Sequence, residues 1–257
     1  MVNLCQDDSV SAESPLSVVI VTHNHAETLA ACLEAVECLE TSPERLVVVD
    51  NASSDGSAEI LSTRRGHLQV EVIREESNTG FAAAANRGIN ATTEPWVLLL
   101  NPDCAPRADL VHNLLEAVAS RPEAATIGSV SPKLLRAEGP DLRPLPMVDA
   151  AGMVVTPSGR HLDRGAGSAD DGSYDRPAWV FGGTAASILL RREELDDVAY
   201  PDTEFFAEPF FAYREDAELA WRLQLRSWRC LYHPAAIAVH RRGFRPEEGR
   251  RGHAEIN

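Results

Sequence analysis

Three short hydrophobic segments in the first half of the chain each end in polar residues that can bind a ligand. The letters THN at 22–24 follow the first segment, DN at 50–51 follow the second, and NPD at 101–103 follow the third. Carboxylate and amide oxygens are hard ligands that suit Mg²⁺ or Mn²⁺ beside a substrate phosphate. Asn-Pro followed by Asp is also typical of a turn into a helix. The residues alone leave both interpretations open.

Two adjacent acids, Glu215 and Asp216, begin a predicted helix in the second half of the chain. Acids in a first turn interact favourably with the helix dipole, which is the common structural reason for them. A carboxylate at that place can also act as a general base that takes a proton from a hydroxyl. His240 ends a later strand-like run and is either structural or a metal ligand. These residues supply candidates for a base and for a metal site.

The segments that must position these residues alternate between strand and helix patterns. Buried strands are predicted in LSVVIVTHN, RLVVVDN and EPWVLLLNPD, an edge strand in QVEVIRE, and helices in AETLAACLEAVECLE, SAEILSTRR, NTGFAAAANRGINAT and ADLVHNLLEAVAS. This alternation with short links predicts an α/β fold with a doubly wound, mostly parallel sheet. Ligands bind such sheets at the carboxyl ends of the strands, so the polar strand ends are expected to meet at one edge.

The second half of the chain is expected to be less regular. Residues 137–178 are rich in Gly, Pro, Asp and Arg, with a small hairpin predicted in MVVTPSGRHL. A segment of this length is usually functional or mobile. The run CLYHPAAIAVH predicts two short strands around His233-Pro234.

Composition narrows the class of protein. The net charge of −15 over 257 residues argues against a nucleic-acid partner. Five cysteines without CxxC spacing indicate a reducing compartment. The polar start of the chain is unlike a signal peptide, and no apolar run suits a transmembrane segment. A cytoplasmic protein is expected, with a homodimer left open. Nicotinamide, P-loop and α/β-hydrolase motifs are missing from the sequence.

The segments taken in order resemble the family 2 glycosyltransferases of the GT-A fold, in their rhamnosyltransferase-like branch. The resemblance is carried by VVIVTHN, VVVDNASSDGS, NTGFAAAANRGI, WVLLLNPD, FGGTAASILLRREEL and FFAYREDAELAWRLQLRSWRCLYHPAAIAVH, from residue 16 to about 243. It implies one GT-A domain with a small acceptor-side β/loop region. The expected divisions are a disordered tail 1–14, a domain 15–243 with a nucleotide-sugar-binding half 15–135 and an acceptor-binding half 136–243, and a flexible tail 244–257.

The resemblance also implies an activity of the EC 2.4 class, a hexosyl or pentosyl transfer. The expected enzyme is inverting and metal-dependent, and it moves a sugar from a dTDP- or UDP-sugar donor to the hydroxyl of a saccharide or small-molecule acceptor. Asp216 matches the catalytic base, while Asp103 and His240 match the site for Mg²⁺ or Mn²⁺. Residues that match the donor nucleotide site are Thr22, Asn24, Asp50, Asp55, Asn78, Gly80, Asn86, Arg87 and Asn101. Residues expected to orient the acceptor are Glu215, Gly183, Thr184 and Trp179.

Two other functions are compatible with part of the pattern. A sugar-phosphate nucleotidylyltransferase would need a glycine- and arginine-rich loop after the first strand, and THNHAETL supplies none. A non-catalytic nucleotide-binding partner protein would need neither Asp103 nor Asp216, and the chain has both. The donor sugar, the choice between uracil and thymine, and the acceptor stay open.

Overall fold

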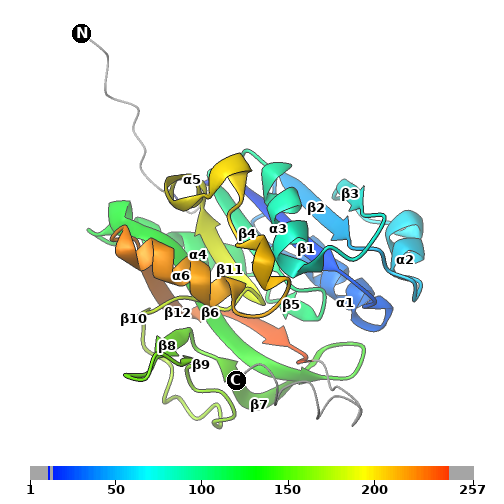
Figure 1. Ribbon diagram of the computed structural model, residues 1–257. Coiled ribbons are helices and arrows are strands. Elements are labelled where there is room, and N and C mark those ends of the chain that lie inside the picture. Colours follow the sequence, from blue (N-terminus) through cyan, green and yellow to red (C-terminus); the bar gives the residue numbers. More distant parts are fainter. Residues whose placement is uncertain (1–10, 12–13, 243–257) are drawn as a thin grey trace.

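The computed structural model describes residue 11 and residues 14–242 as an α/β fold around a ten-stranded sheet (Figure 1). The predicted tails 1–14 and 244–257 therefore lie almost wholly outside the described residues. The first half contains β1 (Leu16–Thr22), α1 (Ala26–Glu37), β2 (Arg45–Asp50), α2 (Ser57–Thr63), β3 (Val70–Arg74), α3 (Gly80–Asn90) and β4 (Trp96–Leu100).

Strands β1 to β4 form a parallel unit in the order β4-β1-β2-β3. Their side chains alternate between two buried faces, which explains the continuous β-branched sequence. Val18 and Ile20 pack in a core with residues of α1 and α4 (Leu110–Ala119), whereas Val19 and Val21 pack in a second core with residues of α3. The doubly wound α/β sheet predicted from the sequence is confirmed.

The second half extends the same sheet on the β4 side, in the order β10-β12-β6-β11-β4. β11 runs antiparallel to both β4 and β6, whereas β12 runs parallel to β6. The remaining elements are β5 (Cys104–Pro106), β6 (Ile127–Glu138), β7 (Arg143–Ala150), β8 (Met153–Val155), β9 (His161–Asp163), β10 (Ala178–Val180), β11 (Ser187–Arg191), α5 (Arg192–Val198), α6 (Glu215–Leu225), β12 (Arg229–His240) and short 3-10 turns at Ala124–Thr126, Pro201–Thr203 and Glu208–Phe210.

Two predictions for the second half need correction or refinement. The two short strands expected around His233-Pro234 are wrong, because β12 is one strand whose register with β6 shifts between His233 and Ile237. This bulge accommodates a proline that cannot donate a ladder hydrogen bond. The segment 137–178 is more regular than expected, since it contains β7 and the predicted hairpin, formed by β8 and β9.

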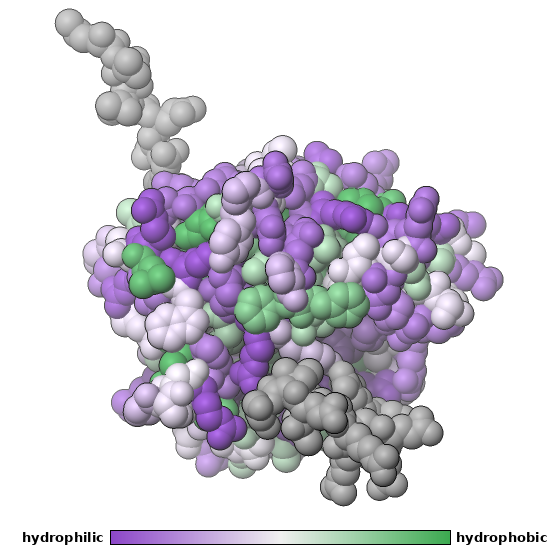
Figure 2. All heavy atoms as spheres, in the orientation of Figure 1, coloured by the Kyte–Doolittle hydropathy of each residue, from purple (hydrophilic) through white to green (hydrophobic). Residues whose placement is uncertain are grey.

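The surface is mostly hydrophilic on the face shown in Figure 2, with scattered apolar patches. Exposed large apolar side chains include Phe210, Phe211 and Tyr213, in the loop before α6. Within the described part of the chain, no helix has the length and hydropathy needed to cross a bilayer.

The carboxyl group of Glu194 is buried in a way that disfavours its charged form. It lies in the first turn of α5 and has no exposed surface. Burial raises the pKa of Glu194 well above its usual range, against a smaller opposing effect of Arg191. The group is therefore protonated in the folded chain at pH values where it is ionised in the unfolded chain.

We predict that Glu194→Gln stabilises the protein at alkaline pH. A raised carboxyl pKa gives stability that is complete below the unfolded pKa and declines as pH rises toward the folded pKa, by at most about 1.4 kcal/mol per pH unit. The amide has no such loss. Urea denaturation should show a higher free energy of unfolding for the variant at pH 8 and a much smaller difference at pH 4. An equal difference at both pH values would contradict the assignment.

Candidate active site

The ends of β1 and β2 bring Thr22 and Asp50 together. The parallel register places these two residues directly opposite each other, and both are buried. One carboxylate oxygen of Asp50 accepts a hydrogen bond from the backbone N–H of Ser53 at 3.0 Å. The hydroxyl of Thr22 is buried with no hydrogen-bond partner among the described residues. The strand ends therefore present a carboxylate and an unused hydroxyl at the carboxyl edge of the sheet.

The loops that follow β1 and β2 are joined by side-chain hydrogen bonds. Asn24, in the left-handed region at φ 57°, accepts a bond from the backbone N–H of Ser54 at 2.8 Å. Asp55 accepts one from the backbone N–H of Ala26 at 2.8 Å, and its other oxygen accepts from Ser57. Asn24 and Asp55 thus fix the shape of the edge where the sequence predicted a nucleotide.

Asn51 holds the turn that begins α3, a function that the sequence did not predict for it. Its side-chain carbonyl accepts from the backbone N–H of Thr79 at 2.9 Å, and its amide donates to Asn78 and to the carbonyl of Gly80, each at 3.0 Å. Asn78 also accepts from the N–H of Gly80 at 2.9 Å. Asn78 and Gly80 therefore lie beside the Asp50 strand end, as expected.

The side chain of Asn86 binds the loop that leads to α6. Its side-chain carbonyl accepts from the N–H groups of Phe205 and Phe206 at 3.0 and 2.8 Å. Its amide donates to the carbonyl of Phe206 at 2.8 Å and lies 3.3 Å from a Glu208 carboxylate oxygen. These contacts leave no free amide group for the predicted nucleotide contact. The structure gives Asn86 a scaffolding position.

Arg87 is also engaged within the protein, because its guanidinium forms an ion pair with Glu75. Its side chain is about half exposed, whereas that of Glu75 is largely buried. Arg87 thus lies beside Glu75, whose backbone N–H donates to the carbonyl of Asp50 at 2.9 Å.

The loop before α6 lies against the first turn of α3. The carbonyl of Phe211 accepts from the N–H of Ala82 at 3.1 Å. Gly80 has a φ of +85°, and a Cβ there would lie 2.5 Å from that same carbonyl. Phe211, Tyr213 and Arg214 all have left-handed φ values. The close approach to Gly80 therefore helps to set an unusual backbone before α6. This backbone positions Glu215 and Asp216, which we call the acid pair.

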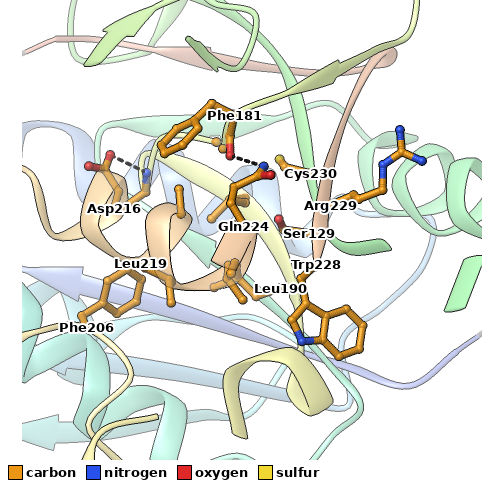
Figure 3. Close-up of a pocket in the computed structure, with 16 residues that line it drawn as sticks. Ser129, Phe181, Leu190, Phe206, Asp216, Leu219, Gln224, Trp228, Arg229 and Cys230 are labelled. Carbon is orange, nitrogen blue, oxygen red and sulfur yellow. Dashed lines mark hydrogen bonds between the residues drawn. The ribbon is translucent and has the colours of Figure 1, made fainter. Parts of the chain in front are cut away.

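Glu215 and Asp216 stand at the start of α6, and Asp216 lines an apolar pocket there (Figure 3). Asp216 accepts from the backbone N–H of Ala185 at 3.3 Å and from that of Ala217 at 2.7 Å. Burial raises the pKa of Asp216. Burial and then the charge of Asp216 raise the pKa of Glu215 to about 7. A desolvated carboxylate with a raised pKa is suited to accept a proton.

The other predicted acceptor residues differ in their relation to this pocket. Gly183 lines it together with Asp216, and Thr184 precedes Ala185, whose N–H donates to Asp216. Trp179 does not line it; its ring packs against the guanidinium of Arg229, with 3.4 Å from Cζ to the ring centroid. Gly183 and Thr184 are thus near the acid pair, whereas Trp179, on β10, packs against Arg229.

Asn101 forms the turn in which Asp103 lies. Its backbone carbonyl accepts from the N–H of Cys104 at 3.1 Å, and its N–H donates to the carbonyl of Ala186 at 2.9 Å. The turn brings the chain into β5, which pairs with the end of β12. The sequence left open whether residues 101–103 form a proline turn or a ligand site. The two interpretations are compatible, because one turn can do both.

Three residues at the β5–β12 junction could hold a metal ion: Asp103, Cys104 and His240, with ligand atoms within 4.8 Å of one another. His240 Nε2 lies 3.4 Å from Asp103 Oδ1, and this buried oxygen has no hydrogen-bond partner. Burial raises the pKa of the Cys104 thiol well above its usual value, so it is a poor ligand. Asp103 offers a carboxylate, which suits Mg²⁺ or Mn²⁺, and His240 offers the nitrogen of an imidazole, a softer ligand.

Comparison with known proteins confirms the predicted resemblance. Residues 17–134 match the family model described as glycosyl transferase family 2. A poly-beta-1,6-N-acetyl-D-glucosamine synthase of Staphylococcus epidermidis is 23% identical over 86% of the chain and 48% of its own length. An N-acetylglucosaminyl-diphospho-decaprenol L-rhamnosyltransferase of Mycobacterium tuberculosis is 26% identical over 88% of the chain and 75% of its own length. The chain thus spans about half the length of the first relative.

Solved structures confirm the GT-A fold. GalNAc-T7 with UDP, GalNAc and Mn²⁺ superposes with a TM-score of 0.68 at 16% identity, over 91% of this chain and 44% of that one. The mannosyltransferase PcManGT of Pyrobaculum calidifontis, in complex with GDP-Man and Mn²⁺, gives 0.64 at 20% identity, over 93% and 61%. Both neighbouring structures contain a nucleotide or nucleotide sugar and Mn²⁺.

We predict that Asn86→Ala impairs the acid-pair loop far more than Asn90→Ala. Asn90, on the same helix, makes one exposed bond to the carbonyl of Thr203, whereas Asn86 makes several buried ones. Loss of buried hydrogen bonds that leaves backbone groups unpaired costs about 1–3 kcal/mol. Chemical denaturation should show this loss for Asn86→Ala and a change within about 0.5 kcal/mol for Asn90→Ala. Equal effects would contradict the scaffolding position.

Proposed function

We propose that this chain, a family 2 glycosyltransferase by the match over residues 17–134, is an inverting, metal-dependent enzyme that uses a dTDP- or UDP-sugar. The observation that carries the proposal is the shared edge of the sheet. Asp50, Asp103 and Asp216 follow or adjoin strand ends there, and each is buried or largely desolvated. Nothing in the packing of an α/β sheet requires three carboxylates in this region.

The proposed reaction needs one base. The acceptor hydroxyl oxygen forms a bond to the anomeric carbon while the bond from that carbon to the diphosphate oxygen breaks, which inverts the configuration. Asp216 takes the hydroxyl proton, for which its desolvated position is suited. Asp103 and His240 would hold the divalent ion, which when bound supplies positive charge beside the diphosphate. Glu215, Gly183 and Thr184 would shape the acceptor side.

The nucleotide end of the donor is assigned to the β1–β2 edge. Asp50 uses one oxygen for the Ser53 N–H, and its second oxygen is available to accept a bond from a pyrimidine imide N–H. Thr22, Asn24 and Asp55 frame this position. UDP in the GalNAc-T7 structure supports a pyrimidine donor, whereas GDP-Man in PcManGT supports testing a guanine nucleotide too. The rhamnosyltransferase relative makes a rhamnosyl donor the first choice to assay.

A sugar-phosphate nucleotidylyltransferase is less well supported by the geometry. The link between β1 and α1 spans only residues 23–25 and has neither glycine nor arginine. A partner protein without catalysis would not need a desolvated carboxylate at the start of α6. These features favour the transferase.

We predict that Asp216→Asn lowers the transfer rate about 10²- to 10⁴-fold, the usual contribution of a general base, with nearly unchanged donor affinity. Glu215→Gln makes the same carboxylate-to-amide change at the adjacent residue, and it should lower the transfer rate far less. For the wild type, the transfer rate should rise with pH, with a midpoint above about 3.9 because burial raises the pKa of Asp216. Turnover by initial rates and donor affinity by calorimetry check both statements. Near-normal turnover of Asp216→Asn would remove the base assignment.

We predict that a donor panel assayed by nucleotide-diphosphate release identifies a dTDP- or UDP-sugar as substrate and that EDTA stops the release. Added Mn²⁺ or Mg²⁺ should restore it. Asp103→Asn should raise the metal concentration needed for half-maximal rate, because a carboxylate binds these ions better than an amide. Release that is indifferent to EDTA, or confined to GDP-sugars, would contradict the metal or the pyrimidine assignment respectively.

A further inference from the structure

We propose that Asp149 is a positioning residue for the metal site, and that it fixes the ring of His240 so that Nε2 faces Asp103. The inference rests on the proposed metal-dependent function and adds a residue to it. Asp149 lies on β7 and has no exposed surface. Its Oδ2 lies 2.8 Å from Nδ1 of His240, 91 positions later in the chain.

The bond to Asp149 determines which nitrogen of His240 is free. A histidine ring can rotate by half a turn and exchange the positions of its nitrogens, and a hydrogen bond at one nitrogen prevents this. With Nδ1 bound to Asp149, Nε2 points at Asp103 Oδ1, 3.4 Å away. A carboxylate behind a ligating histidine is a recurrent arrangement that orients the ring and increases its basicity.

Asp149 is not itself suited to bind the ion. Its second oxygen, Oδ1, forms ion pairs with the Nε atoms of Arg242 at 2.7 Å and Arg136 at 3.5 Å. Two guanidinium groups thus compensate its charge on the side away from His240. Asp103 differs, because its Oδ1 pairs with Nε2 of His240 rather than with a guanidinium group. The two carboxylates therefore have distinct tasks, one toward the ion and one toward the histidine.

The contacts of Arg242 connect this arrangement to the β8–β9 hairpin. Its guanidinium also pairs with Asp163 at the end of β9. Three separate segments, β7, β9 and the residues after β12, therefore converge behind His240. Within the segment 137–178, Asp149 is the residue of this arrangement that contacts His240.

The test compares Mn²⁺ affinity, measured by electron paramagnetic resonance, for wild type, Asp149→Asn and Asp163→Asn. Asp149→Asn keeps the side-chain shape but removes the charge that orients the ring. We expect it to lower Mn²⁺ affinity about 10- to 100-fold. Asp163→Asn is the matched control, because Asp163 contacts the same arginine and not the histidine. Its affinity should stay within about twofold. Circular dichroism verifies that each variant is folded.

A double variant distinguishes positioning from a general structural effect. In a His240→Ala background, Asp149→Asn should cause no further loss of Mn²⁺ affinity, since Asp149 acts through the ring. Additive losses would overturn the inference. So would unchanged affinity in Asp149→Asn while the wild type binds Mn²⁺, a result that leaves the proposed function intact. A wild type that binds no Mn²⁺ would overturn the metal-dependent function and the inference together.

A measurement on the wild type alone tests the same geometry if Asp149→Asn does not fold. Nitrogen-15 NMR of the Mg²⁺-saturated protein should show a proton on Nδ1 of His240 and none on Nε2. The opposite tautomer, or protons on both nitrogens, would overturn the inference.

Discussion

The in-register parallel pairing of β1 with its neighbours is the constraint on which the site depends. Val18 to Thr22 pair with Leu46 to Asp50, and Leu16 to Ile20 pair with Trp96 to Leu100. These runs are buried on both faces, so a shift of one residue would move every side chain into the wrong core. The hydrophobic pairing therefore fixes where each strand ends, and it brings the polar residues that follow the strands to one edge.

The sequence could predict what local patterns determine. Alternating strands and helices implied the doubly wound sheet, and strand-end residues such as Asp50 and Asp103 could be placed from their position after a buried run. Asn86 and Asp149 could not be interpreted in this way. Their partners lie 119 and 120 residues away for Asn86 and 91 for Asp149, and no periodicity encodes such distances. The continuity of β12 across its bulge was missed, because this continuity comes from pairing with the neighbouring strand β6.

Among the described residues, desolvated carboxyl groups gather around the proposed site, with Glu194 as an exception. Asp216, Glu215 and Asp149 are all removed from water, and each lies in or directly behind the proposed site. Their desolvation opposes folding, yet it raises the pKa of Asp216 and Glu215, as the proposed base requires. Glu194 has the same cost without lying among these residues, on a helix that packs against β11 and α6. Burial alone is therefore a weak guide to function in this chain; convergence on one edge is the discriminating feature.

The two halves proposed from the sequence are not independent folding units. The boundary between residues 135 and 136 falls inside β6, which pairs with β12 along most of its length. The proposed metal site would join the halves, because Asp103 comes from the first and His240 from the last strand of the second. The loop before α6 is in turn held by α3, through Asn86 and the close approach to Gly80. Donor and acceptor sides therefore share their supports, so a change in the scaffold of one side must displace residues of the other.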